Sequence, residues 1–380
     1  MQLHNPIEMP TKNLHDHPFD EGTIVKLEIF EDYLKEWLPT FVMSHADDDI
    51  CIFDFFAGTG RDLNGVAGSP IRILQQINGQ AGNIFQKRCR VRVCLNEYDT
   101  SKFNSLKQCC EQYIGEEKEL SRLYDKYLFL HFYNKDFAEL FPKCHSTIYA
   151  HPALVFLDQN GMKFLADKYL SDLEKLPQTD FLYYLSSSYF IRFGETEAFQ
   201  TNMKIDMDKV RQNPYKYVHR SILEQLKERL PQGSKLKLYP FTIKKGANIY
   251  GIIFGAKHPL AVDKFLRTVW KKNAINGEAN FDIDDDKKKR QLELFGEKKL
   301  TKIESFQEDL RQKILNGELQ TNKKVYDFTL EQGHIPQHAF DELKKMKKEK
   351  LIDYNERTPL VNYDKVYKEK RIVSYKITKQ

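Results

Sequence analysis

The chain has 380 residues, of which 41% are hydrophobic and 30% charged, and its formal net charge is +5. A chain of this length is expected to form two or three domains, and its composition excludes a wholly disordered protein. No apolar run approaches the roughly 18 residues that a membrane span requires. The N-terminus also lacks a basic segment followed by an apolar one, so we expect no secretory signal and a cytoplasmic location.

Residues 1–22 are polar and include Pro and His, so a loose N-terminal arm is expected there. Apolar residues then recur at steps of three and four over residues 24–38, which predicts an amphipathic helix that ends at Pro39. The arm holds His15 and His17 without further metal ligands, and no Cys/His spacing matches a zinc site. No metal is therefore predicted.

Seven short, mostly apolar runs follow, and segments with helical periodicity separate most of them. They occupy residues 50–56, 91–95, 128–132, 153–157, 181–185, 236–239 and 248–254. Strands that alternate with helices indicate βαβ units and a largely parallel sheet, and the last two runs are close enough to form an antiparallel pair. The pattern predicts an α/β fold over residues 23–280: a Rossmann-like class I methyltransferase sheet with helices on both faces.

The charge-rich segment 281–300 is expected to be a linker or an exposed connection. Beyond it, helical patterns and then an alternating stretch occupy residues 305–315, 323–331, 336–350 and 354–377. Three helices followed by a β-wing predict a winged-helix-like domain at residues 301–380. This part has 17 Lys and Arg against 13 Asp and Glu, so most of the net positive charge lies here.

The strongest local signal is the run 54–61, in which a hydrophobic strand leads directly into a Gly-x-Gly turn. Gly58 and Gly60 tolerate positive φ and let the backbone approach a ligand closely. Many α/β proteins bind adenosine-bearing cofactors at the carboxyl ends of their strands in this way. Leu63 replaces the third glycine of a dinucleotide fingerprint, and a tight turn without a ligand is the alternative. Asp54, Gly58 and Gly60 are therefore candidate cofactor-binding residues.

Further polar residues follow the second and third expected strands. Glu97 comes after the second strand, where Rossmann-like folds place an acid that accepts hydrogen bonds from ribose hydroxyls. Asn134 and Asp136 come after the third strand, where a polar side chain commonly binds the adenine amino group. All three are candidate cofactor-binding residues, and helix capping is the alternative at these positions.

Asp158, Gln159 and Asn160 follow the fourth strand, where amino-group methyltransferases carry an Asp/Asn-Pro-Pro-aromatic motif. In that motif the acid or amide holds the target nitrogen, and the aromatic ring stacks on the base. Both prolines and the aromatic residue are missing here, so a strand-terminating turn is the alternative. Asp158 and Asn160 are the candidate catalytic residues, and Asp158 is placed to orient an acceptor or the cofactor amine.

Several stretches of the chain taken together resemble the three-Cys-motif partner protein family (TcmP). The resemblance covers about residues 15–280, and it rests on residues 23–27, 33–38, 54–60, 68–70, 156–161, 256–260 and Trp270. It implies a class I methyltransferase-like domain with S-adenosylmethionine as cofactor. It also implies a partner, a radical-SAM-like protein that bears three cysteines. The family pattern after the fourth strand resembles Asp-Pro-Phe-Gly, and this chain departs from it at Gln159 and Asn160.

The three cysteines of the family name belong to that partner, so the six cysteines of this chain need not form a metal site. They include no CxxC pair and lie in one stretch between Cys51 and Cys144. Several lie within apolar strand-like or helical runs. We expect free, reduced and mostly buried thiols.

Lys344, Lys345, Lys347 and Lys348 lie on the third expected helix of the winged-helix-like domain. In a helix-turn-helix protein the recognition helix enters the major groove of DNA. Lysines at adjacent positions spread around a helix, so a solvated face is the alternative. These four lysines are the candidate nucleic-acid contacts.

The leading hypothesis is an S-adenosylmethionine-dependent methyltransferase-like protein that acts on DNA or RNA, without membrane association. One alternative is a non-catalytic partner or scaffold of a radical-SAM-like three-Cys protein. The other is a metal-dependent nuclease on the same Rossmann-like frame.

Overall fold

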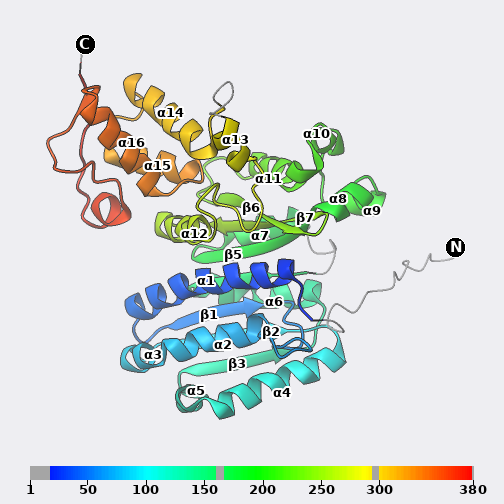
Figure 1. Cartoon of the computed structure of the whole chain (residues 1–380). Helices are drawn as coiled ribbons and strands as arrows, with labels where there is room; N and C mark the ends of the chain where they lie inside the picture. Colours follow the sequence, from blue (N-terminus) through cyan, green and yellow to red (C-terminus); the bar gives the residue numbers. More distant parts are fainter. Residues whose placement is uncertain (1–17, 160–166, 293–298, 379–380) are drawn as a thin grey trace.

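Figure 1 shows a computed structural model of the chain, which describes residues 18–159, 167–292 and 299–378. Seven strands form one sheet in the order β3-β2-β1-β4-β5-β7-β6. The strands are β1 Asp49–Asp54, β2 Arg90–Asn96, β3 Leu128–Tyr133, β4 Ala153–Leu157, β5 Thr179–Ser186, β6 Lys237–Lys245 and β7 Asn248–Ala256. The seven predicted strands and the class I methyltransferase sheet are thus confirmed.

The register of the sheet brings the ends of its central strands together. Strands β1 to β5 are parallel, whereas β7 runs antiparallel to both β5 and β6. All six residues of β1 are buried, as expected for a central strand covered on both faces. Asp54 at the end of β1 pairs with Leu95 of β2 and Phe156 of β4. Residues that follow β1, β2 and β4 therefore meet at one edge.

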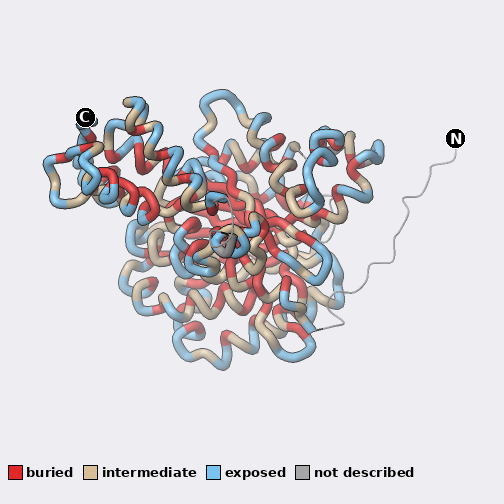
Figure 2. Tube along the Cα trace, turned by 45° about the horizontal axis from the view of Figure 1, so that its top comes forward, coloured by how far each residue is buried: buried red, intermediate tan, exposed pale blue. Residues whose placement is uncertain are grey.

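Helices cover both faces of the sheet, and each face has its own apolar core (Figures 1 and 2). One core takes side chains from α1 Glu21–Ser44, α2 Ser69–Gly79, α3 Ala81–Lys87, α4 Thr100–Glu116, α5 Lys118–Leu123 and α12 Pro259–Lys272. The other takes them from α6 Phe137–Ala150, α7 Asp167–Lys175, α8 Ser187–Phe193, α9 Glu197–Asn202, α10 Met207–Arg211 and α11 Val218–Glu228. A short 3-10 turn, η2 Tyr215–Tyr217, precedes α11.

The first helix is longer than the sequence suggested. It begins at Glu21, within the predicted arm of residues 1–22, and residues 1–17, with His15 and His17, lie outside the described part of the chain. Its far end also differs, because the helix continues through Pro39 and ends at Ser44. The prediction that Pro39 ends the helix is therefore wrong.

Packing explains why α1 tolerates its proline. A proline removes one backbone donor from a helix and crowds the preceding turn. Beyond Pro39, however, Val42 is fully buried, and the ring of Phe41 lies 4.7 Å from the ring of Trp37. These contacts stabilise the last turns of the helix against the cost of the proline.

The C-terminal part contains the three predicted helices, α14 Lys302–Leu315, α15 Asn322–Glu331 and α16 Pro336–Lys348, followed by an antiparallel pair, β8 Ile352–Asp353 and β9 Lys376–Ile377. The predicted long alternating wing is not observed, because each of these strands has two residues and a helical turn, η3 Asp364–Lys368, lies between them.

Side-chain hydrogen bonds replace the strand ladder in this wing. Asn322 is fully buried at the start of α15. Its amide donates to the carbonyls of Leu360 and Arg371 at 3.1 and 2.9 Å, and its oxygen accepts from the Val373 N–H at 2.9 Å. One buried side chain thus fixes the connection without a longer sheet.

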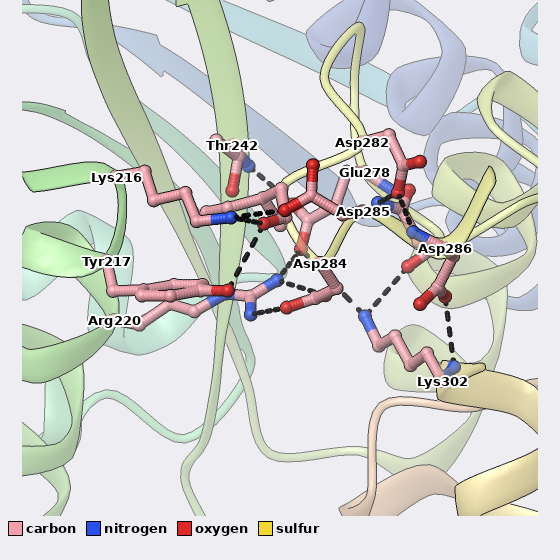
Figure 3. A network of polar contacts seen from close by, with 12 residues as sticks. Lys216, Tyr217, Arg220, Thr242, Glu278, Asp282, Asp284, Asp285, Asp286 and Lys302 are labelled. Carbon is pink, nitrogen blue, oxygen red and sulfur yellow. Dashed lines mark hydrogen bonds and ion pairs between the residues drawn. The ribbon is translucent and has the colours of Figure 1, made fainter. Parts of the chain in front are cut away.

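The segment predicted as an exposed linker, 281–300, is packed against the α/β domain where the structure describes it (Figure 3). Asp284 pairs with Arg220 of α11 at 2.8 Å. Asp286 is fully buried at the start of α13 Asp286–Leu292 and accepts from the Lys302 N–H at 2.9 Å. Asp284 and Asp286 of this run can lie against the protein because they have cationic or backbone N–H partners, whereas Asp285, Lys287, Lys288 and Arg290 are exposed.

The cysteines match the expectation from the sequence. All six are free, and four of them, Cys51, Cys89, Cys110 and Cys144, are buried. Burial raises the pKa of Cys51 and Cys89 to about 12 and that of Cys144 to about 11. These thiols are therefore protonated and packed as small apolar groups at neutral pH.

Candidate functional site

The turn after β1 has a backbone conformation that favours glycine. Gly58 and Gly60 have φ angles of 65° and 88°, in the left-handed region. A Cβ atom on residue 60 would lie 3.0 Å from the Sγ of Cys109. A hydrogen bond from the Gly68 N–H to the Gly60 carbonyl, at 2.8 Å, closes the turn. A side chain at either glycine would therefore strain this edge of the sheet.

Glu97 connects this turn to the end of β2. One carboxylate oxygen accepts from the Gly58 N–H at 3.0 Å, and the other accepts from the Asp99 N–H at 2.9 Å. A carboxylate has about four lone-pair sites. Because the side chain is half-buried, its oxygens can still accept hydrogen bonds from a ligand. The predicted ribose-binding acid thus lies beside the Gly-x-Gly turn.

Asn96, to which the sequence analysis gave no role, fastens the ends of three strands. Its amide donates to the Phe55 carbonyl at 3.0 Å and to the Lys135 carbonyl at 3.1 Å, and its oxygen accepts from the Lys135 N–H at 3.1 Å. The residue is 2% exposed, and its polar atoms are satisfied by these partners. The feature of the sequence that could have indicated this role is an amide residue directly after the apolar run 91–95.

The residues after β3 support the loop and the next helix. Asn134 donates to both carbonyls of residues 97–98 at 2.8 Å, and its oxygen accepts from the Thr100 hydroxyl at 3.1 Å. Asp136 caps α6 by accepting from the Ala138 N–H at 2.8 Å. The capping role considered for Asp136 is thus present, and Asn134 contacts the backbone of Glu97 at this edge.

Asp54 is the most unusual group at this edge. It is fully buried, its Oδ1 accepts from the Phe56 N–H at 3.2 Å, and no hydrogen bond of normal geometry reaches Oδ2 from the described residues. The pKa of Asp54 is raised to about 7: burial raises it most, and the charges of Asp158 and Glu97 add to this, whereas hydrogen bonds from Ser69 and the Phe56 N–H lower it. Asp54 can therefore change its charge near neutral pH.

Asp158 forms an ion pair with Lys26 of α1. The Lys26 side chain is 9% exposed and that of Asp158 is 20% exposed, so both charges are largely removed from water. The Lys26 Nζ also lies 4.5 Å from the centre of the Tyr184 ring, which stacks on Tyr250 at 5.5 Å. No local pattern marks Lys26 as a site residue, because it is 132 positions from Asp158 and fits the amphipathic pattern of its helix.

Of the next two residues after Asp158, the structure describes Gln159. Asn160, the second candidate catalytic residue, lies outside the described residues. Gln159 is buried and donates to the Tyr183 hydroxyl of β5 at 3.3 Å. The residue that replaces the first proline of the methyltransferase motif thus contacts the neighbouring strand.

Three carboxyl groups therefore share the edge formed by β1, β2 and β4. Asp54, Glu97 and Asp158 interact electrostatically. Among the described residues, Lys26 is the one cation that forms an ion pair with any of the three. An edge with this excess of negative charge favours a ligand that brings a positive charge to Asp54 and hydroxyl donors to Glu97.

The lysines of α16 divide into two kinds. Lys344, Lys345 and Lys348 are exposed. Lys347 is half-buried, pairs with Asp353 at 3.0 Å and donates to the Tyr354 carbonyl at 2.6 Å. Lys347 therefore holds the wing against the helix, and the other three point to solvent.

Two further features are absent from the described parts of the chain. No group of three or more His, Cys, Asp and Glu side chains there is arranged to hold a metal ion, and no helix there is long and apolar enough to cross a membrane. A cavity of about 480 Å³ does not include Asp54, Glu97 or Asp158. It is lined by Asp49, Phe53, Arg92, Cys94, His131, Tyr133, Lys135, Leu140, Lys143, Cys144, Thr147 and His151.

Residues 280–359 match the family model described as the GMT-like wHTH domain. The C-terminal winged-helix domain is confirmed. No curated protein matches the chain.

Several solved structures are similar to about two thirds of the chain. Trm1 from Pyrococcus horikoshii, in complex with S-adenosyl-L-methionine, has a TM-score of 0.34 and 12% identity, over 66% of this chain and 59% of Trm1. The O-methyltransferase TomG from Streptomyces achromogenes, in complex with SAM, has a TM-score of 0.31 and 11% identity, over 63% of this chain and 90% of TomG. An O-methyltransferase from Bacillus cereus, in complex with SAH, has a TM-score of 0.29 and 11% identity, over 64% of this chain and 95% of that enzyme. The chain spans less than two thirds of Trm1, and the strand order described above, not these low scores, establishes the fold.

Proposed function

We propose that this chain is an S-adenosylmethionine-dependent methyltransferase that acts on nucleic acid. The observation that carries the proposal is Asp54, a fully buried carboxyl group that forms no ion pair with a described residue, next to the glycine turn and near Glu97 and Asp158. Its burial destabilises the ionised form, and a cationic ligand would compensate that charge. S-adenosylmethionine carries a positive sulfonium and an ammonium group.

The residues at the sheet edge fit the parts of this cofactor. The turn at Gly58 and Gly60 would allow close approach of the ligand to the backbone, and Glu97 would accept hydrogen bonds from the ribose hydroxyls. Asn134 and Asp136 follow the adjacent strand, where the adenine would lie. Asp54 would stand opposite the cationic end. When bound, the cofactor supplies an electrophilic methyl group.

The acceptor side of the site would be formed by Asp158, Lys26 and the stacked rings of Tyr184 and Tyr250. The ion pair holds the Asp158 carboxylate at the end of β4, where it would orient an acceptor. Both rings are partly exposed, and an aromatic ring at this place would stack on a base. A base within a duplex would have to be flipped out to reach them.

The first experiment is calorimetric titration of the full chain with S-adenosylmethionine. We expect saturable binding that Glu97→Ala weakens by about tenfold or more, because a charge-assisted hydrogen bond contributes about 1.5–3 kcal/mol. Glu111→Ala, which removes an exposed acid from α4, is the matched control and should bind like the wild type. Thermal unfolding checks that each variant is folded. No binding to folded wild-type protein would refute the proposal.

A non-catalytic partner is the second candidate function, favoured by the absence of the two prolines and the aromatic residue after Asp158. In that case the chain would bind S-adenosylmethionine and dock a three-Cys radical-SAM-like protein, as the resemblance to TcmP predicts. Transfer of a labelled methyl group to DNA or RNA distinguishes the two. Incorporation that Asp158→Asn abolishes supports the enzyme, whereas cofactor binding without incorporation supports the partner.

A further inference from the structure

The first turn of α16 is packed against the α/β domain. In helix-turn-helix proteins the N-terminal residues of the recognition helix contact base edges. In this chain the indole N–H of Trp270, on α12, donates to the Gly333 carbonyl at 2.9 Å, just before α16. The ring of His338 lies 4.4 Å from Trp270, and the ring of His334 stacks on Phe306 at 4.1 Å. The N-terminal end of α16, which would contact bases in such a protein, is therefore occupied by contacts within this chain.

Both histidines at this contact are buried and uncharged. His334 is 3% exposed and His338 is 9% exposed, and their Nδ1 atoms lie 3.0 Å apart. Burial, together with the charge of Lys302, lowers the pKa of His334 to about 2 and that of His338 to about 4. At neutral pH neither ring brings positive charge to the start of the helix.

Two tyrosines fix the helix that precedes α16. The Tyr239 hydroxyl of β6 donates to the Leu330 carbonyl at 2.8 Å. The Tyr326 hydroxyl of α15 donates to Asp263 of α12 at 3.0 Å. The donors and acceptors of these hydrogen bonds are buried. The winged-helix domain therefore cannot expose the first turn of α16 without breaking the two hydrogen bonds.

The other end of α16 carries unpaired positive charge. Three exposed lysines, Lys344, Lys345 and Lys348, lie on its last turns, and Lys350 and Lys376 are exposed nearby on the start and end of the wing. None of these five lysines forms an ion pair with a residue that the structure describes.

The acids closest to this end already have other cationic partners. Glu342 and Glu349 both pair with Arg311 of α14, at 2.7 and 2.6 Å. Asp353 pairs with Lys347. The exposed lysines therefore form a surface with excess positive charge, which polyanions would neutralise.

The outward face of the first half of α16 has the opposite character. Gln337 and Asp341 are exposed there, and the Gln337 amide donates to Asp341 at 2.7 Å. An acid on this face disfavours approach of a phosphate. Charge along the exposed face of α16 thus changes from negative to positive towards its C-terminal end.

We propose that this winged-helix domain binds nucleic acid through backbone phosphates at the C-terminal end of α16 and the adjoining wing, and not through bases read by the first turn of the helix. Phosphate contacts position a nucleic acid but carry no sequence information. Choice of the methylated base would then fall to the α/β domain. The proposal rests on nucleic acid being the substrate, as proposed above.

The test measures fluorescence anisotropy of labelled duplex DNA, duplex RNA and single strands with the full chain, over about 50–300 mM KCl. For Lys344→Gln/Lys345→Gln/Lys348→Gln we expect binding to weaken about tenfold or more at the lowest salt, equally for unrelated sequences. The slope of log affinity against log salt should fall by about 1 to 3, because each phosphate contact contributes about 0.9. The nucleic acid that binds tightest identifies DNA or RNA as the source of the phosphates.

The control Lys107→Gln/Lys118→Gln/Lys126→Gln removes the same charge from exposed positions around α4 and α5, at the β3 end of the molecule (Figure 1). It should bind like the wild type. Gln337→Ala should change neither affinity nor sequence preference. The proposal is overturned if the α16 variant binds like the control, or if Gln337→Ala changes the preference among sequences.

Titration with S-adenosylmethionine separates this proposal from the proposed function. The α16 variant should bind the cofactor as the wild type does, because its lysines are remote from Asp54 and Glu97. Cofactor binding without any wild-type affinity for nucleic acid would overturn the phosphate surface alone. Nucleic-acid binding without cofactor binding would overturn the methyltransferase proposal alone.

Discussion

Asp54 lowers the stability of the folded protein as the pH rises. Its folded pKa is about 7, whereas a carboxyl group in an unfolded chain titrates near 4. Between these values the folded state binds more protons than the unfolded state, so the free energy of unfolding falls as pH rises from about 4 to about 7. A group that destabilises its own fold in this way is typical of a binding site.

Asp54→Asn removes this titration while it keeps the size of the side chain. We expect the variant to be more stable than the wild type at about pH 8, by a few kcal/mol, since each pKa unit corresponds to about 1.4 kcal/mol. The difference should largely vanish near pH 4. Urea unfolding at both pH values measures it, and an equal difference at both would contradict a raised pKa of Asp54.

Asp180 is the natural comparison for this variant. It is also buried with its pKa raised to about 7, but it accepts from the Tyr33 hydroxyl at 2.8 Å within the core beside α1. Asp180→Asn should share the stability gain at about pH 8. If Asp54 contacts the cofactor, Asp54→Asn alone should weaken the binding of S-adenosylmethionine.

At the scale of elements, α11 is joined to the segment before α13 by a buried ion network (Figure 3). Arg220 of α11 binds Glu278 at 2.5 Å and Asp284 at 2.8 Å. Glu278 is 1% exposed and also accepts from the Thr242 N–H of β6 at 2.7 Å. The network fixes the chain that enters the winged-helix domain.

Arg220→Met should destabilise the protein by about 3 kcal/mol, because it leaves Glu278 buried without its main cation. Arg220→Met/Glu278→Gln should recover part of the loss, since the amide still accepts from Thr242. Chemical unfolding of the single and double variants tests this, and a double variant that loses the sum of both effects would argue against the pair.

Elements were predictable where one local pattern decided them. The strands were recognisable because central strands of a covered parallel sheet read as short apolar runs, as in residues 153–157. The end of the first helix was predicted wrongly at Pro39, because local rules omit the packing of Val42 that stabilises the helix beyond it. The long β-wing was predicted wrongly, because hydrogen bonds of a single buried side chain, Asn322, replace the expected strand pairing.

At the scale of the whole molecule, the two domains share one apolar core. A continuous cluster of buried side chains extends from the sheet into the winged-helix domain and includes Phe241 of β6 and Leu343 of α16. Trp270, 3% exposed, lies between the domains. We therefore expect one cooperative unfolding transition for the whole chain.

Trp270→Ala should destabilise this contact by about 3–5 kcal/mol and separate the unfolding of the winged-helix domain from that of the sheet. Trp270→Phe keeps an aromatic ring but removes the donor to Gly333, so its cost should be smaller, about 1–3 kcal/mol. Differential scanning calorimetry measures both. A single unshifted transition in the alanine variant would show that the domains do not depend on this contact.

The sequence by itself determined the order of elements and the residues that end the central strands. Gly58, Gly60, Glu97 and Asp158 follow apolar runs, and parallel strands bring their carboxyl ends to one edge, so local patterns sufficed. Only the tertiary structure decided which charges are compensated and which helix end is free. Lys26 reaches Asp158 across 132 positions. The first turn of α16 contacts Trp270 of α12, and the Lys302 N–H at the start of α14 donates to the buried Asp286. Such contacts depend on distances in space that no local pattern records.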